Sequence, residues 1–78
     1  MRFIATFYTQ AAALLSNRAL KNAGIESKAG PVPRELSSSC GTCVHYQSED
    51  PMISFLDADV ESVYEDTGNG YRVLLHRD

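Results

Sequence analysis

The spacing of hydrophobic and polar residues predicts an alternation of short strands with helices. Residues 2–8 are rich in aromatic and β-branched side chains, which is typical of a strand half-buried on a sheet. Thr9 is a good N-cap for a helix over residues 10–23, and Gly24 stands at the C′ position that ends it. The face of this helix that we expect to be buried consists of Ala12, Leu15, Ser16, Ala19, Leu20 and Ala23. Side chains this small indicate that the helix lies close against a sheet.

Shorter segments follow, separated by turn-forming residues. Gly30-Pro31-Val32-Pro33 interrupts regular structure and begins a polar loop that runs to Gly41. The segment from Ser48 to Pro51 has the capping hydroxyl, early acidic residues and proline of a helix start, and Gly68-Asn69-Gly70 favours a tight hairpin. The elements predicted from these signals are strands at residues 25–29, 42–47, 60–65 and 71–76 and a second helix at about residues 50–58.

The resulting order of elements, β-α-β-β-α-β with one more strand, predicts an α+β fold of the ferredoxin-like split β-α-β type. Right-handed connections would place both helices on one face of an antiparallel sheet and leave the other face open. The residues expected on the open face are Ile4, Thr6, Cys43, His45 and Val63. We predict a single domain over residues 1–78, in which residues 1–65 form the sandwich and residues 66–78 add a C-terminal hairpin or strand.

The length and charge of the chain exclude several classes of protein. A chain of 78 residues has room for one small core, which excludes a two-domain enzyme, a doubly wound nucleotide-binding sheet and a barrel. Because so small a core gives limited stability, a homodimer is one of the assemblies that we consider. The net charge of -3 divides into +4 through Arg34 and -7 from Glu35 onward. The basic residues are scattered, which disfavours a nucleic-acid partner.

The N-terminal sequence and the number of cysteines indicate the cellular compartment in which we expect the protein. The N-terminal apolar stretch is broken at Thr9 and Gln10, as a signal peptide would not be, and no stretch has the length of a membrane span. Two cysteines in such a chain favour a reducing compartment. We therefore expect a cytoplasmic location and no membrane partner.

The loop before the third strand holds the residues with the clearest chemistry. The predicted topology puts this loop at the same end of the sheet as the start of the first helix, so Cys40 would lie near the amides of residues 9–12. A helix N-terminus stabilises anions, and a thiol placed there is expected to ionise more readily. The residues expected to bind at this site are Thr9, Arg34, Ser38, Ser39 and Gly41. In the competing interpretation, Cys40 packs as a small apolar residue and the serines turn the chain.

Cys40 and Cys43 form a Cys-x-x-Cys pair with three chemical interpretations. Thiol–disulfide exchange normally places the first cysteine at a helix start, but a strand pattern follows Cys43, and alternation from Thr42 would send the two side chains to different faces. Zinc would have Cys40, Cys43 and His45, one ligand short of a closed site unless a dimer completes it, so we expect neither a metal nor a cofactor. In the third interpretation Cys40 accepts sulfur or selenium, as a persulfide or its selenium analogue, with Cys43 assisting or buried as a structural thiol.

The sequence favours a carrier, sensing or binding role over enzymatic turnover. It contains neither a Gly-x-Ser-x-Gly elbow nor a phosphate-binding loop, and its acidic residues suit helix starts and turns better than an acid/base pair. A chain this small can present a thiol but can scarcely enclose a substrate.

The segment Pro33-Arg34-Glu35-Leu36-Ser37-Ser38-Ser39-Cys40-Gly41 resembles a family of small bacterial domains labelled selenium/sulfur carrier-like. The resemblance extends over residues 2–65 and includes Lys-Asn-Ala-Gly-Ile at the end of the first helix. It implies that Cys40 is the family's cysteine, with Arg34, Ser38, Ser39 and Gly41 around it. Members of this family also occur fused to TusA-like sulfur-carrier domains. Cys43 and the tail from Thr67 depart from the family's pattern.

Our leading hypothesis is therefore a cytoplasmic carrier of sulfur or selenium on Cys40, which would exchange its cargo with a sulfur-transfer or selenium-metabolism protein. Two alternatives stay open. One is a thiol-redox or sensing module that uses Cys40 and Cys43. The other is a non-catalytic binding or assembly domain in which both cysteines are structural.

Overall fold

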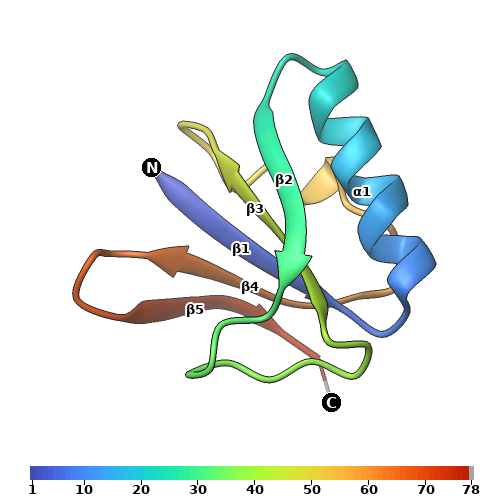
Figure 1. Cartoon of the computed structure of the whole chain (residues 1–78). Helices are drawn as coiled ribbons and strands as arrows, with labels where there is room; N and C mark the ends of the chain where they lie inside the picture. The colour runs from blue at the N-terminus through green and yellow to red at the C-terminus, as the bar shows by residue number, and fades with distance from the viewer. Residues whose placement is uncertain (78) are drawn as a thin grey trace.

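A computed structural model describes residues 1–77 as a five-stranded antiparallel sheet with one helix (Figure 1). The strands are β1 (Arg2–Phe7), β2 (Glu26–Pro31), β3 (Thr42–Gln47), β4 (Val60–Asp66) and β5 (Tyr71–His76), the helix is α1 (Gln10–Asn22), and a 3-10 turn, η1, spans Ile53–Phe55. The strands lie in the order β2-β3-β1-β4-β5. The α+β class and all five strands predicted from the sequence are confirmed.

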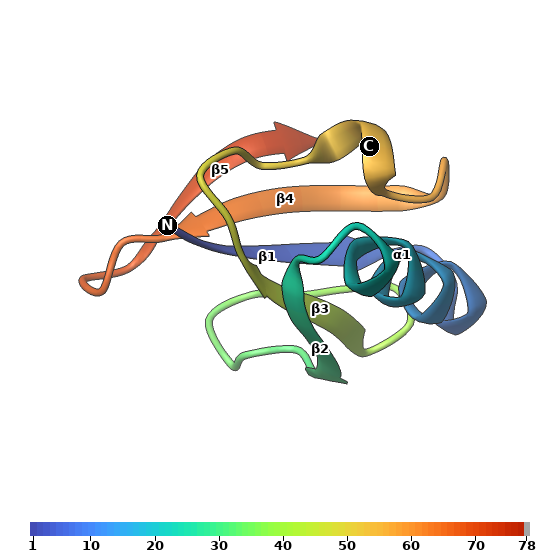
Figure 2. The same cartoon turned by 90° about the horizontal axis from the view of Figure 1, so that it is seen from above.

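The helix α1 begins and ends at the residues that the sequence indicates. The Thr9 hydroxyl accepts a hydrogen bond from the Ala12 amide at 3.1 Å, and Gly24 has a positive φ of 80° just beyond the last turn. The helix lies across β1, β2 and β3 (Figure 2). Its buried residues are Ala12, Ala13, Ser16 and Leu20. The expected stripe was therefore wrong for Leu15, which is 54% exposed, and for Ala23, which is exposed.

The second helix expected at residues 50–58 does not form, so the two-helix ferredoxin-like order β-α-β-β-α-β is not matched. Aspartate side chains bond to nearby backbone in this segment: Asp50 Oδ1 accepts from the Met52 amide at 2.7 Å, and Asp57 Oδ1 accepts from the Asp59 amide at 2.9 Å. Such local bonds compete with helix formation. Met52 also has a left-handed φ of 56°, which is incompatible with a continuing helix. Only the turn η1 remains between β3 and β4.

The two faces of the sheet are covered differently. The face toward α1 forms the main core, which includes Phe3, Ala5, Phe7, Val44, Tyr46, Val60 and Val63. Strand alternation places Ile4, Thr6 and Cys43 on the second face, where they too are buried. The second face is therefore only partly open, and Val63, expected on it, lies in the main core.

The misplacement of Val63 has a local cause. Phe7 pairs with Val60 and Thr6 with Ser62, so Glu61 is an extra residue in β4 at a bulge. The extra residue puts Val60 and Val63, three positions apart, on the same face of the sheet.

Candidate functional site

Residues 32–41 form a loop that wraps around one end of the sheet and lies at the bottom of Figure 1. Its first half lies against the β4–β5 hairpin, where Glu35, Leu36 and Ser37 line a groove with Tyr64 and Tyr71. Its second half reaches the side of the sheet that carries α1, where Cys40 packs against the main core. The loop thus joins the two faces of the sheet at the end where β1 passes into α1.

Ser38 fixes the cysteine end of this loop. Its hydroxyl donates to the Phe7 carbonyl at 3.0 Å and accepts from the Cys40 amide at 3.4 Å. The same oxygen lies 3.8 Å from the Cys40 sulfur, and the thiol donates to the Thr42 carbonyl at 3.4 Å. Ser38 therefore ties Cys40 to the last residue of β1.

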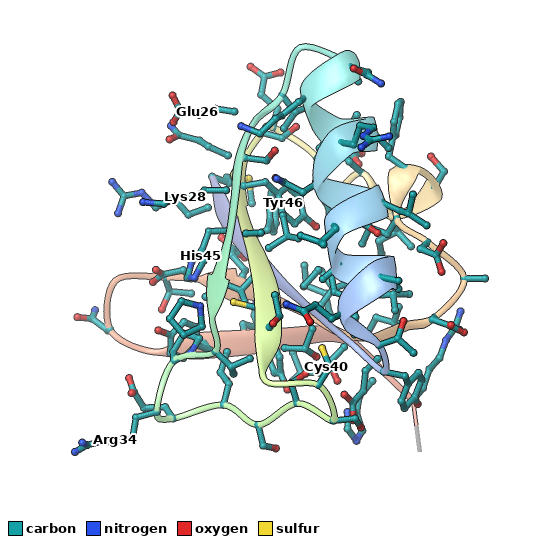
Figure 3. The ribbon with its side chains drawn as sticks, turned by 45° about the vertical axis from the view of Figure 1, so that its right-hand side comes forward. Glu26, Lys28, Arg34, Cys40, His45 and Tyr46 are labelled. Atoms are coloured by element: carbon teal, nitrogen blue, oxygen red, sulfur yellow. The ribbon has the colours of Figure 1, made fainter. Side chains whose placement is uncertain are left out.

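Cys40 is partly buried, and Figure 3 shows it beneath the first turn of α1. Within residues 1–77, the partners of its sulfur are the loop groups of Ser38 and Thr42, whereas the Thr9 hydroxyl caps the helix through the Ala12 amide. The hydroxyl of Thr9 thus caps the helix and makes no hydrogen bond to the thiol.

Of the other predicted site residues, Gly41 has a clear structural role in the loop and Arg34 lies away from the cysteine (Figure 3). Gly41 has a positive φ of 74°, which explains why glycine stands between the cysteine and β3. Arg34 is exposed, and Figure 3 shows it at the outer corner of the loop, well apart from Cys40. The structure brings Ser38 and Cys40 together but leaves Arg34 out of the cluster.

Glu61 is a residue of this site that the sequence analysis did not single out. Its carboxylate accepts from the Ser39 amide at 3.1 Å and from the Ser39 hydroxyl at 3.3 Å. The β4 bulge at Glu61 re-aims its side chain, which is a known consequence of a bulge. No spacing signal in the sequence links Glu61 with Ser39, which lies on a different segment of the chain.

Replacing Glu61 with alanine should loosen the loop without unfolding the domain, because the carboxylate is the side chain that holds Ser39. We expect the Ser39 amide to exchange its hydrogen about threefold to tenfold faster, as suits the loss of about 1 kcal/mol of exposed bonding. Amide hydrogen exchange measures this directly. Glu61→Gln, which keeps one acceptor oxygen, should lie between the two, and Glu49→Ala is a matched control on an exposed acid. Equal exchange in Glu61→Ala and the parent would show that the contact does not restrain the loop.

Cys43 has different surroundings from Cys40. Its side chain is fully buried on the second face, its thiol donates to the Pro31 carbonyl at 3.4 Å, and His45 Nε2 lies 3.4 Å from the sulfur. Burial, with a smaller effect of the nearby Cys40, raises the pKa of the Cys43 thiol from 9.0 to about 11. Cys43 therefore stays protonated at neutral pH. Both cysteines are free thiols.

In residues 1–77 no three His, Cys, Asp or Glu side chains gather in a way that could hold a metal ion. Over the same residues, none of the helical segments combines the length and the apolar character needed to cross a membrane.

This geometry defines a class of protein, namely an α+β domain that presents a free, partly buried cysteine on a serine-rich loop. A family model described as "Putative Se/S carrier protein-like" matches residues 2–55, and the chain belongs to that family. The match contains the cysteine loop and ends at Phe55, before β4 and β5. Searches of curated proteins and of solved structures found no match.

Proposed function

We propose that the protein carries sulfur or selenium on Cys40, as a persulfide or its selenium analogue. Membership of the family supports the general kind of function. The observation that favours Cys40 over Cys43 is the contrast in their surroundings: Cys40 is partly exposed on a loop, whereas Cys43 is fully buried with a raised pKa.

Loading would transfer the outer sulfur of a partner's persulfide to Cys40. The Cys40 thiolate attacks that sulfur, the donor's sulfur–sulfur bond breaks, and the donor leaves as a thiolate. On ionisation the Cys40 sulfur loses its bond to the Thr42 carbonyl, and the Ser38 hydroxyl, 3.8 Å away, can then turn to donate to it. The partner that this chemistry requires is a sulfur-transfer or selenium-metabolism protein, and the reaction suits a reducing compartment such as the cytoplasm.

The test of this proposal is loading by a cysteine desulfurase with cysteine as the sulfur source, followed by intact mass measurement. The parent protein should gain a sulfur adduct that is removed by a reductant. Cys40→Ser should gain none, and Cys43→Ser, the matched control, should load as the parent does. Absence of an adduct on the parent, under conditions that load a known carrier, would refute the proposal.

The redox alternative needs a bond between Cys40 and Cys43. Cys40 packs against the core on the α1 side, whereas Cys43 points to the second face from within β3. A bond between them would therefore displace Thr42 from its pairing with Pro31. A measurable reduction potential for an intramolecular bond would favour this alternative. If the double variant Cys40→Ser, Cys43→Ser keeps its partner and its cellular role, this supports a binding or assembly domain in which both cysteines are structural. Pairing of two copies through the sheet also stays a prediction.

A further inference from the structure

A groove of about 690 Å³ lies on the second face of the sheet, between the cysteine loop and the β4–β5 hairpin. Glu35 and Leu36 form its wall on the loop side, and Tyr64, Asp66, Tyr71 and Val73 line it from the two strands. Because Glu35 and Leu36 belong to the same loop as Cys40, a molecule seated in this groove contacts the segment that carries the cysteine.

The groove offers aromatic and apolar surface. The rings of Tyr64 and Tyr71 meet edge to face, with centroids 6.5 Å apart and an interplanar angle of 72°. Val73 beside them is 57% exposed, one of the most exposed large hydrophobic side chains of the protein. Tyrosines of this kind supply much of the binding energy in protein interfaces.

The charge of the groove has one sign. Glu35 and Asp66 are its charged residues, and the residues that line it include no lysine, arginine or histidine. Both carboxylates line the groove together with Tyr71, and burial, followed by the carboxylates of Glu35 and Asp66, raises the pKa of Tyr71. The groove thus combines aromatic rings with a negative potential.

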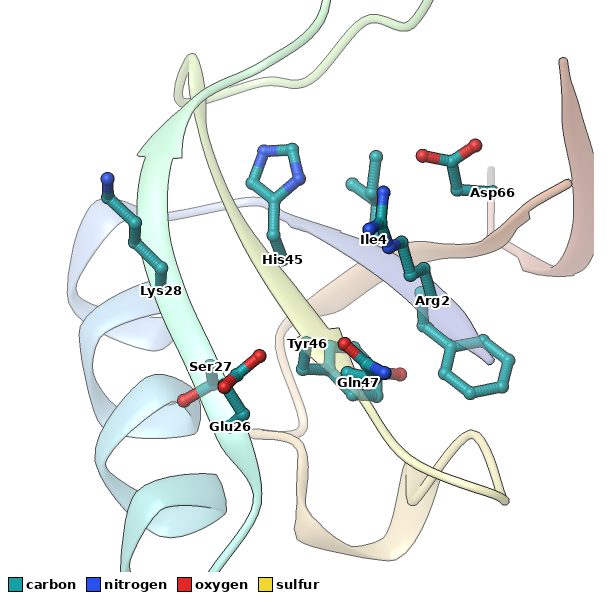
Figure 4. A pocket seen from close by; sticks show the side chains of 10 residues that line it. Arg2, Ile4, Glu26, Ser27, Lys28, His45, Tyr46, Gln47 and Asp66 are labelled. Carbon is teal, nitrogen blue, oxygen red and sulfur yellow. The ribbon is translucent and has the colours of Figure 1, made fainter. Parts of the chain in front are cut away.

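A smaller cavity among the described residues differs in this respect. It has about 480 Å³ and lies on the same face toward β2 and β3, where its lining includes Arg2, Lys28 and His45 as well as Glu26 and Asp66, the last of which it shares with the groove (Figure 4). Charges of both signs give that cavity no clear preference for the charge of a ligand. The groove at Tyr71 is therefore the stronger candidate for a selective contact.

We propose that this groove docks an arginine-bearing segment of the partner protein that exchanges sulfur with Cys40. The guanidinium is the side chain that satisfies both features, since it stacks on aromatic rings and bonds to carboxylates through a planar fork. The partner's role rests on the proposed function, whereas the docking contact depends only on the groove.

Fluorescence anisotropy of a labelled peptide of alternating arginine and glycine tests the contact. The parent should bind this peptide, should bind it less tightly as salt is raised, and should not bind a matched glutamate–glycine peptide. The double variant Glu35→Gln, Asp66→Asn should bind about tenfold more weakly, and Tyr71→Leu should also weaken binding. The Asp66→Asn substitution keeps the side-chain oxygen that accepts from the Gly68 amide, so the hairpin turn should survive.

The double variant Glu26→Gln, Glu49→Gln is the control, because it changes the net charge equally at exposed acids outside the groove. Equal weakening in the control would show that net charge alone attracts the peptide and would overturn the proposal, as would absence of binding to the parent. Dimerisation of the parent that the groove variant abolishes would mean that a second copy occupies the groove, which also overturns it. Loading of Cys40 by the desulfurase on the same variants separates the two proposals: a parent that binds the peptide but never loads overturns the proposed function alone, and a groove variant that loses the peptide yet loads as fast as the parent overturns the docking of the sulfur-exchanging partner.

Discussion

Replacing Phe7 with alanine should lower the free energy of unfolding by about 3–5 kcal/mol, the usual cost of removing a buried aromatic ring. Phe7 is completely buried in the main core, at the point where β1 passes into the helix cap. A core of this size supplies about 3–5 kcal/mol in total, so the variant should be largely unfolded at room temperature. Urea denaturation followed by circular dichroism measures the change. Unfolding of β1 should also release the loop, because Ser38 donates to the backbone carbonyl of residue 7.

Phe55→Ala is the matched control for this prediction. Phe55 lies in η1 and is 40% exposed, so the same substitution removes much less buried surface and should cost about 1 kcal/mol or less. Equal losses at Phe7 and Phe55 would mean that the core is not centred on β1 as described.

The protein should lose about 2–3 kcal/mol of stability between pH 9 and pH 11 because of Cys43, whose native pKa is raised from 9.0 to about 11. In that range the unfolded chain releases the thiol proton and the native state keeps it. The unfolded state therefore binds fewer protons, and stability falls as pH rises. Below pH 9 the contribution is fully present. Urea midpoints measured at a series of pH values give the slope.

Two variants test the assignment of this slope to Cys43. Cys43→Ala should remove the loss between pH 9 and pH 10 and reduce it above pH 10, where Tyr46 begins to contribute, whereas Cys40→Ala should leave most of the loss in place. Burial also raises the pKa of Tyr46 above its usual range, so both variants should still lose stability at higher pH. A slope that is unchanged in Cys43→Ala would show that another group titrates.

The strands were predictable because each depends on a signal within its own residues. β3 and β5 begin and end where the sequence predicts, and α1 is fixed by Thr9 and Gly24 at its two ends. The second helix was not predictable from the same kind of signal. Ser48, Asp50 and Pro51 look like a helix start, but Asp50 bonds to the Met52 amide and completes a turn instead.

Only the contacts between site residues that are close together in the sequence were predictable. Ser38 and Cys40 are two residues apart, so a shared loop brings them together. Glu61 reaches the loop through the bulge in β4, and the same bulge reverses the expected side of Val63. A bulge shifts the alternation of every later residue in its strand, and nothing in the local pattern of β4 reveals it. The groove at Tyr71 also depends on long-range pairing.

The central position of β1 in the sheet indicates which strands the cysteine loop needs in order to keep its structure. β1 lies between β3 and β4, yet the family match ends at Phe55 and so includes only the first of these neighbours. Without β4, one edge of the most central strand would be unpaired, and the loop would lose Glu61. The family match is therefore shorter than the hydrogen-bonded sheet, and the loop that carries the cysteine is held partly by Glu61, which lies outside the matched residues.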